Sequence, residues 1–252
     1  MVDQLIALSV VVIGAIAFAV YGLREREEAT PRPSVSPFFR DLSGEVGRVA
    51  EAGASIHVGL GHGGLLDADG MTSIAALQGL SSLIDLSAAY DTPPYITTGD
   101  PTVYLLADHR MRRAYARLGN VGRYRPEFVH FSAHDPVLYA AMTATLLHDR
   151  PVDTNVMLGS FGQEISLLTE AARRRQAKSL GGTTTLEGSA ALYPALPDDR
   201  QLVGEFLFAG GAAVTDRASF DAGLHTQDVL RWVVVVALIV TAVLSLVGLI
   251  GG

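Results

Sequence analysis

The chain has 252 residues, contains no cysteine and carries a formal net charge of −7 at pH 7. The lack of cysteine excludes a disulfide framework, a thiolate zinc site and a cysteine nucleophile. The acidic balance predicts that nucleic acid is not a partner, because binding it needs a local basic patch. The densest basic cluster, Arg173 to Arg175, is typical of the solvated end of a helix.

Each end of the chain carries an apolar run without a charged residue. Gln4 to Gly22 and Trp232 to Ile250 each span 19 residues, and a helix of that length crosses roughly 30 Å of hydrocarbon. A cleaved signal peptide is the alternative for the first run, but no positive charge flanks it at its start and no small-x-small cleavage pattern precedes Arg24. We therefore predict transmembrane helices over residues 1–23 and 230–252, with membrane lipid as a partner.

The arginines beside the two runs predict the orientation of the chain. All of them lie on the inner sides of the runs, and the two outer ends carry no lysine or arginine: Arg24, Arg26, Arg32, Arg40, Arg217 and Arg231. Because basic residues accumulate on the cytoplasmic side of a membrane, we expect the centre of the chain in the cytoplasm. The prediction is a two-pass protein of the inner (plasma) membrane with both termini outside.

Between the two runs we expect a stalk and one domain. Residues 24–37 read REREEATPRPSVSP, and the three prolines predict an extended, stiff segment. Residues 38–229 are long enough to bury one core. The domain opens with an amphipathic stretch that places Phe38, Leu42, Val46 and Val49 on one helical face.

Short β-type runs then alternate with longer helical ones. The predicted strands are Ser55 to Leu60, Tyr95 to Thr98, Glu127 to Ser132, Thr154 to Gly159 and Ala177 to Gly182. The predicted helices are Met71 to Tyr90, Thr102 to Leu118, Val137 to Leu147 and Gln163 to Arg175. This alternation is typical of the α/β class, so we predict a mostly parallel, Rossmann-like sheet flanked by helices.

Two of the strand-to-helix turns repeat an Asp-Pro pair, Asp100-Pro101 and Asp135-Pro136. An aspartate carboxylate is a preferred N-cap, and proline suits the next position because its missing N–H would have had no partner there. The pattern therefore predicts helix initiation. A functional role stays open, since ligands bind at such turns in parallel sheets.

Polar and glycine residues follow every predicted strand, and a parallel sheet would bring them to one edge. We take them as candidate binding residues for a nucleotide-like anion: Gly59, Gly61, His62, Gly63, Gly64, Thr98, Asp100, Ser132, His134, Asp135, Ser160, Gly181, Gly182 and Thr183. Gly59, Gly61 and Gly64 have the G-x-G-x-x-G spacing, but no helix opens directly after them and no acidic strand end follows at the expected distance. Tight-turn glycine is the simpler interpretation.

Known catalytic templates do not fit the sequence. There is no G-x-x-x-x-G-K-[ST], no G-x-S-x-G and no H-E-x-x-H pattern, so we assign no catalytic residue, cofactor or metal. His62 with Asp100 or Asp135 could form an acid-base pair, and His134 could pair with Ser160, if the guessed sheet places them together. Glu205, among apolar neighbours, predicts a buried carboxylate with an ion-pair or backbone partner.

Three phrases carry a resemblance to a known family: GDPTVYLLADHRMRRAY, DTNVMLGSFGQEISLL, and LVGEFLFAGGA followed by TQDVLRW. They resemble an uncharacterised bacterial family, the domain of unknown function numbered 6754. The resemblance covers Ser55 to Trp232 and implies a membrane-anchored protein, but it transfers no catalytic residue.

Two classes of function follow. The first is a non-enzymatic scaffold or subunit of a membrane assembly, as a homo-oligomer or with other membrane proteins. Small residues form a stripe on each run and would let helices approach closely in lipid, within one chain or between chains. They are Ala15, Ala19 and Gly22 on the first run and Ala237, Thr241, Ser245 and Gly248 on the second. The second class is a membrane-tethered small-ligand-binding or enzymatic domain.

Overall fold

The computed structural model describes residues 37–68 and 70–204, together with Gly14, Val20, Leu207, Thr226 and residues 229–235. The chain divides into two compact units. One contains Met1–Arg32 and Asp216–Gly252, and the other contains Pro33–Thr215. The second unit holds the α/β domain.

The α/β domain is built on a six-stranded sheet in the order β3-β2-β1-β4-β5-β6, and all five pairings are parallel. The strands are β1 (Ser55–Gly61), β2 (Tyr95–Thr98), β3 (Val129–Phe131), β4 (Val152–Ser160), β5 (Lys178–Thr183) and β6 (Gln201–Val203). The predicted α/β class and parallel Rossmann-like sheet are confirmed.

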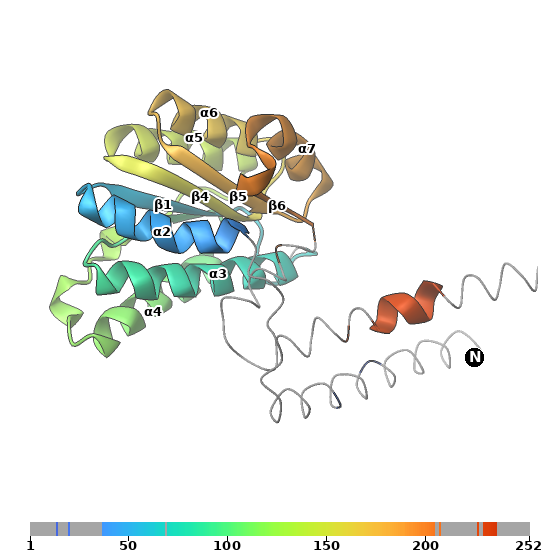
Figure 1. Cartoon of the computed structure of the whole chain (residues 1–252), viewed down its shortest axis with the longest axis horizontal. Coiled ribbons are helices and arrows are strands. Elements are labelled where there is room, and N and C mark those ends of the chain that lie inside the picture. The colour runs from blue at the N-terminus through green and yellow to red at the C-terminus, as the bar shows by residue number, and fades with distance from the viewer. Residues whose placement is uncertain are drawn as a thin grey trace, which may run out of the picture. The chain divides into compact units, whose positions relative to one another are not determined.

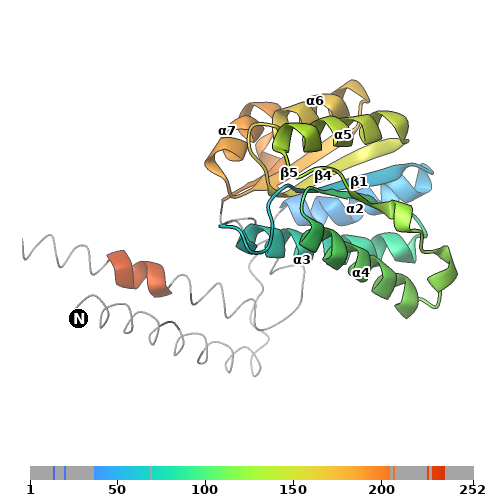
Figure 2. The ribbon, with the colours of Figure 1, turned by 180° about the vertical axis from the view of Figure 1, so that it is seen from behind.

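Helices cover both faces of this sheet (Figures 1 and 2). Helices α2 (Pro37–Glu51), α3 (Gly70–Ala89) and α4 (Pro101–Arg117) lie on one face. Helices α5 (Pro136–Asp149), α6 (Ile165–Arg174) and α7 (Leu186–Ala195) lie on the other. Three short 3-10 turns, η1 (Val121–Arg123), η2 (Pro126–Phe128) and η3 (Asp198–Arg200), complete the domain.

The central strands are buried on both sides, which explains their near-continuous apolar sequence. In β1, Ile56, Val58 and Leu60 are fully buried and belong to the same apolar cluster as Leu80 and Ile84 of α3. A second cluster, around Tyr139, Met157, Phe161, Ile165 and Leu168, lies under α5 and α6. Burial of these side chains gives the sheet its two covered faces.

Most predicted elements are present with small shifts at their ends. β3 is shorter than predicted because Pro126–Phe128 form a 3-10 turn before it. α7 and β6 were not predicted, since Gly188, Pro194 and Pro197 in that segment are typical breakers of regular structure. Pro194 lies in the last turn of α7, and Thr185 accepts a hydrogen bond from the Gly188 N–H at its start.

Both Asp-Pro pairs start helices, as predicted. Oδ1 of Asp100 accepts a hydrogen bond from the Val103 N–H at 2.8 Å, and proline occupies the first turn of α4. Oδ1 of Asp135 accepts from the Leu138 N–H at 2.9 Å at the start of α5. The capping interpretation of both aspartates is confirmed.

The predicted stalk, Glu205 and nearly all of both apolar end runs fall outside the described residues. Within the described part of the chain, no helix is long and apolar enough to cross a membrane. In the unit of the two chain ends, Gly14 and Leu230 are both helical. A Cβ added to Gly14 would lie 3.5 Å from Cδ1 of Leu230, so the two segments touch at this point.

Candidate functional site

The direction of the strand order reverses between β1 and β4. We use the word crevice for the region at the carboxyl ends of these two strands, between the turns that follow them. Connections from β1 lead through β2 to β3 on one side, and connections from β4 lead through β5 to β6 on the other. In open parallel sheets, ligands bind outside the carboxyl ends of the strands at this reversal point. The turns after β1 and β4 therefore form the candidate site.

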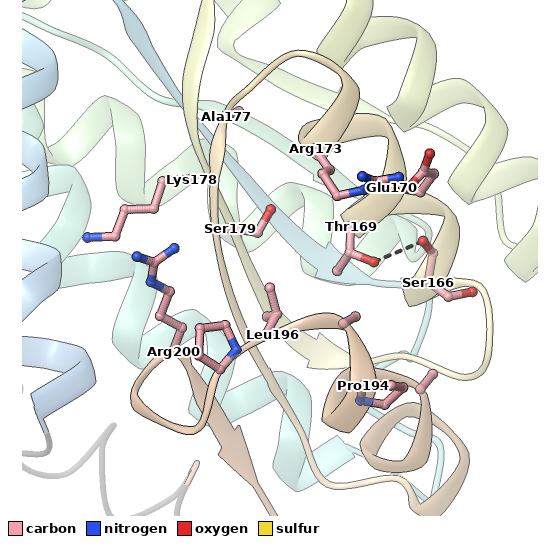
Figure 3. Close-up of a pocket in the computed structure, with 13 residues that line it drawn as sticks. Ser166, Thr169, Glu170, Arg173, Ala177, Lys178, Ser179, Pro194, Leu196 and Arg200 are labelled. Atoms are coloured by element: carbon pink, nitrogen blue, oxygen red, sulfur yellow. Dashed lines mark hydrogen bonds and ion pairs between the residues drawn. The ribbon is translucent and has the colours of Figure 1, made fainter.

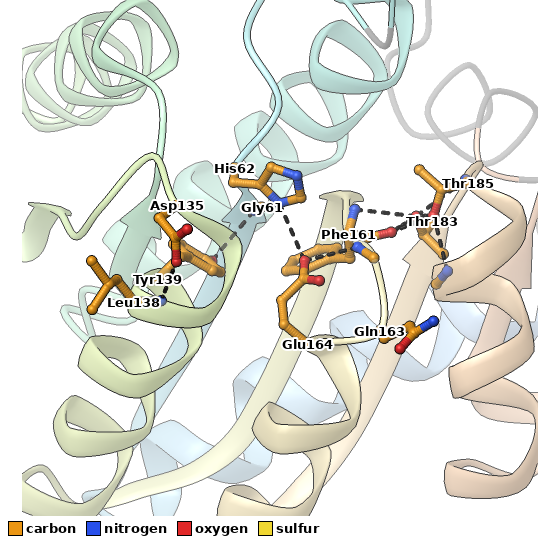
Figure 4. Close-up of polar contacts among 12 residues, drawn as sticks. Gly61, His62, Asp135, Leu138, Tyr139, Phe161, Gln163, Glu164, Thr183 and Thr185 are labelled. Carbon is orange, nitrogen blue, oxygen red and sulfur yellow. Dashed lines mark hydrogen bonds and ion pairs between the residues drawn. The ribbon is translucent and has the colours of Figure 1, made fainter.

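His62 and Glu164 face each other across this crevice (Figure 4). Nδ1 of His62 lies 3.2 Å from Oε1 of Glu164, and the two side chains are 24% and 5% exposed. Oε1 of Glu164 also accepts a hydrogen bond from the Gly162 N–H at 2.8 Å. Burial alone would raise the pKa of Glu164, but the contact with His62 and the Gly162 N–H together hold it below its ordinary value. The carboxylate thus stays charged near neutral pH.

The backbones of β1 and β4 come very close beside this pair. The His62 N–H donates to the Ser160 carbonyl at 3.2 Å. Gly61 has a φ of +76°, and a Cβ there would lie 2.1 Å from the same carbonyl oxygen. Only glycine fits this conformation and this spacing. Gly61 therefore sets the floor of the crevice, which agrees with the tight-turn interpretation.

A chain of hydrogen bonds runs from the crevice through the centre of the sheet. The Gly61 N–H donates to the hydroxyl of Tyr139 at 3.4 Å, and that hydroxyl lies 3.0 Å from Oγ1 of Thr97. Oγ1 of Thr97 lies 2.9 Å from Nε2 of His57, and Nδ1 of His57 lies 2.7 Å from Oδ1 of Asn155. All four side chains are fully buried.

The partners assign the direction of this chain. The amide oxygen of Asn155 can only accept, so Nδ1 of His57 carries the proton and Nε2 accepts from Thr97. The hydroxyl of Tyr139 then donates to Thr97. Every group is satisfied with a neutral imidazole. Burial lowers the pKa of His57 to about 4, and burial raises the pKa of Tyr139 to about 12, so both groups stay neutral at pH 7.

Of the predicted site residues, Gly61, His62 and Ser160 meet at the crevice, and Thr183 lies next to it. Oγ1 of Thr183 is 3.4 Å from the backbone N of Phe161 in the turn after β4. Gly63 accepts a hydrogen bond from Ser73 through its carbonyl. The structure therefore brings four of the predicted residues together at the reversal point of the sheet.

A second group surrounds the turn after β2. The Gly64 N–H donates to Asp67 at 2.8 Å, and Thr98 accepts from the Asp100 N–H at 3.2 Å. A Cβ added to Gly64 would lie 2.8 Å from Oδ2 of Asp100. Carboxylates thus occupy the space beside Gly64 where a phosphate would have to approach.

Three predicted residues lie elsewhere than expected. Gly59, Gly181 and Gly182 lie inside strands β1 and β5. The predicted strands already contain them, so it is wrong to count them among the residues that follow the strands. A Cβ on Gly59 would lie 2.9 Å from the Tyr139 hydroxyl, and one on Gly181 would lie 2.7 Å from Leu192. Gly59 thus lets helix α5 pack closely against the sheet, and Gly181 does the same for helix α7.

The last three predicted residues lie at the margin of the sheet. Ser132, His134 and Asp135 follow β3, which β2 separates from β1. His134 is thus remote in the strand order from Ser160 on β4, and the proposed pairing of these two is wrong. His62 contacts Glu164, in place of the predicted Asp100 or Asp135.

The charge of this edge is acidic. The turns at residues 61–70, 99–101, 131–136, 160–165 and 183–187 hold aspartate, glutamate and two histidines, but no lysine or arginine. The N-termini of α4, α5 and α7 are already capped by the side chains of Asp100, Asp135 and Thr185. Among the described residues, no group of three histidine, aspartate or glutamate side chains could hold a metal ion. Chemically, the edge offers hydrogen-bond acceptors to a donor or a cation.

A family model matches this chain over residues 3–251: the domain of unknown function DUF6754. The chain belongs to this family. The matched range includes both apolar end runs as well as the α/β domain. No curated protein and no solved structure matches the chain significantly.

Sequence reasoning missed five residues of the candidate site: His57, Thr97, Tyr139, Asn155 and Glu164. Glu164 carried a recognisable signal, since it stands two residues after a glycine at a strand-to-helix turn. His57 and Asn155 lie inside apolar strands, and a single polar residue within such a run signals a buried hydrogen-bonding partner. Tyr139 follows Asp135 by four residues, one helical turn above the cap.

Proposed function

We propose that this protein is a membrane-anchored α/β domain that acts as a non-enzymatic scaffold or subunit of a membrane assembly. The two apolar end runs span the membrane, and the domain lies in the cytoplasm with both termini outside. Membrane lipid and further copies of the chain or other membrane proteins are its partners.

One observation carries this proposal: the chain enters and leaves the α/β domain at the same edge of the sheet. β6 is parallel to the other strands, so Val203 ends at the carboxyl edge. Three residues connect α2 to the start of β1 at the opposite edge. Since 15 helical residues and seven strand residues both extend about 22 Å, α2 begins near the carboxyl edge as well. Both end runs can therefore enter one membrane without crossing the domain.

The same edge exposes large apolar side chains. Leu66 is 95% exposed in the turn after β1, Leu186 is 86% exposed at the start of α7, and Leu138 is 58% exposed at the start of α5. Exposed apolar groups gathered on one side of a domain are typical of contact surfaces. We infer that this edge faces lipid or the membrane segments of a partner.

Gly14 gives independent support in the unit of the chain ends. Its contact with Leu230 places a small residue of the N-terminal segment against the C-terminal segment. Small residues at such contacts let membrane helices pack closely.

The orientation can be tested in the cysteine-free chain. A single cysteine at Gln176, which is exposed on the amino edge, should resist a membrane-impermeant maleimide in intact cells and react in inverted vesicles. Labelling of Gln176→Cys from outside would overturn the cytoplasmic placement. The scaffold role is tested by the mass of the complex in mild detergent. A discrete particle of several chains is expected, and a monomer would contradict it.

The crevice itself favours a second candidate, binding of a small ligand. The His62–Glu164 pair at the reversal point of the sheet is the observation behind it. Because the surrounding turns lack lysine and arginine, the ligand would present hydroxyl or amine donors to Glu164, whereas a nucleotide phosphate would meet carboxylates. A purified monomer with a co-purifying small molecule that is lost in Glu164→Gln would establish this function; a wild-type preparation without one would oppose it.

A further inference from the structure

A groove lies at the opposite, amino edge of β4, β5 and β6, away from the crevice (Figure 3). It consists of two cavities of about 460 and 410 Å³. They share four lining residues: Arg173, Ala177, Lys178 and Arg200. The shared residues make the two cavities one continuous groove, which we call the amino-edge groove.

One half of this groove is cationic. Arg48, Arg173, Lys178 and Arg200 line the smaller cavity, against the single carboxylate of Asp153. Three of these cations already have acidic partners, since Arg48 binds Glu45 and Asp153, Lys178 binds Glu45, and Arg173 binds Glu170. Figure 3 shows the guanidinium of Arg200 and the ammonium of Lys178 directed toward the same space.

Arg200 differs from its neighbours. Within the part of the chain that the structure describes, no carboxylate lies within ion-pair distance of it, and its Nε is buried without a hydrogen-bond partner. A buried donor without an acceptor destabilises a fold, because it has lost its hydration. An anion at this position would supply the missing acceptor and accept from the guanidinium in a bidentate manner.

The other half of the groove is suited to an organic group. Ala191, Pro194, Leu196 and Pro197 line it, together with the hydroxyl-bearing Ser166 and Thr169. Its volume exceeds what a phosphate alone needs. A ligand with an anionic end and an apolar or planar body would fill both halves.

Four features oppose an anion here: the carbonyl end of α6 and the carboxylates of Glu45, Asp153 and Glu170, of which Asp153 and Glu170 line the groove. The carbonyl end of α6 points to this edge and carries roughly half a negative charge. However, the carbonyls of Ala172 and Arg173 already accept backbone hydrogen bonds from residues 175–177. Each of the three carboxylates is paired with a cation: Glu45 with Arg48 and Lys178, Asp153 with Arg48, and Glu170 with Arg173. Arg200 is therefore the cation of the groove to which no such carboxylate is paired within the described part of the chain.

We propose that the amino-edge groove binds a soluble small molecule that bears a phosphate group. The phosphate lies between Arg200 and Lys178, and the organic part lies against Pro194 and Leu196. The groove is at the edge opposite to the one where the chain leaves the domain, which favours a soluble ligand over a lipid headgroup. This site is independent of the crevice and of the scaffold role.

The test uses the full chain in mild detergent at constant ionic strength, so that screening of charges does not change. Thermal unfolding is measured with inorganic phosphate, phenyl phosphate and phenol, and phosphate binding is measured directly by equilibrium dialysis. Inorganic phosphate should raise the midpoint by mass action, and phenyl phosphate should do so at lower concentration. Phenol and added anionic phospholipid should leave it unchanged.

Three variants make the outcome specific to the groove. Arg200→Gln should weaken phosphate binding about tenfold or more, and Arg200→Lys should weaken it less, because the charge remains. Arg113→Gln, which removes an exposed arginine of α4 remote from the groove, should bind as wild type does. If Arg200→Gln does not fold, equilibrium dialysis of phosphate with Arg200→Lys provides the test in its place. Equal binding by Arg200→Gln and wild type, equal loss in Arg113→Gln, or a stronger effect of phospholipid than of phenyl phosphate would overturn the proposal.

Discussion

Acidification should destabilise the domain through His57, before its carboxylates are protonated. In the folded chain the pKa of His57 is about 4, because the imidazole is fully buried and its two nitrogens are already satisfied in the neutral form. The ordinary value is 6.5. The unfolded chain therefore takes up a proton as the pH falls below 6.5, whereas the folded chain does so only near pH 4.

The magnitude follows from this difference. The contribution of neutral His57 to the free energy of unfolding is fully present above pH 6.5 and is lost as the pH falls from 6.5 to 4. Proton linkage gives a decrease in unfolding free energy of about 2 kcal/mol between pH 7 and pH 5. His130 adds to the loss in the same direction, because burial also lowers its pKa. The pKa of Glu164 lies below its ordinary value, so its stabilising contribution is lost only at lower pH.

The assay is urea unfolding of the full chain in mild detergent at pH 7 and pH 5, followed by circular dichroism. His57→Gln removes the titrating group, so the difference in unfolding free energy between the two pH values should shrink by about 2 kcal/mol relative to wild type. Gln at this position can change the absolute stability, but the readout is the pH dependence. His148→Gln, at an exposed position of α5, is the matched control. An unchanged pH dependence in His57→Gln would refute the assignment of His57 as a buried neutral base.

Further predictions concern backbone and capping positions. Asp100→Ala should lower the unfolding free energy by about 1 kcal/mol, and Asp100→Asn should cost little because the amide keeps the cap; loss of function in a fully stable Asn variant would instead identify a site residue. Gly61→Ala should cost roughly 2–5 kcal/mol, since its Cβ would collide with a backbone carbonyl, whereas Gly53→Ala, at a similar φ but in open space, should cost about 1 kcal/mol. Equal costs would contradict the close approach of β1 and β4. Glu45→Gln should cost roughly 2 kcal/mol, because it removes the buried carboxylate that Arg48 and Lys178 share. Glu170→Gln, on an exposed helix face, should change the midpoint little; the reverse order would be inconsistent with the structure.

The elements of the α/β domain could be predicted from the sequence because its local signals agree with one another. The β-branched run before Asp100 and the Asp-Pro start of α4 both indicate a strand followed by a helix, and the structure has both. The segment of α7 lacked such agreement. Its Gly188 and Pro194 contradict a helix locally, and tertiary packing of Leu192 against β5 decides its conformation.

The site could be predicted only in part, because the strand order cannot be read from local patterns. Residues that follow parallel strands all lie at the carboxyl edge of the sheet. Which of them are neighbours depends on the order of the strands. His62 and Glu164 are 102 positions apart in the sequence (164 − 62), and they meet because β1 and β4 are neighbours in the sheet. The same limit explains the wrong pairing of His134 with Ser160, whose strands turned out to be three places apart.

The two outermost strands have a consequence for how copies of this chain can associate. β3 and β6 are each three residues long, so each margin offers very few unpaired backbone groups to a neighbouring molecule. Long, flat margins invite a second chain to extend the sheet, and short ones discourage it. Copies of this chain are therefore not expected to join into a continuous sheet through β3 and β6. Any assembly that they form has to be built from helices, turns and end segments, whose contacts can be made and broken without disturbing the sheet.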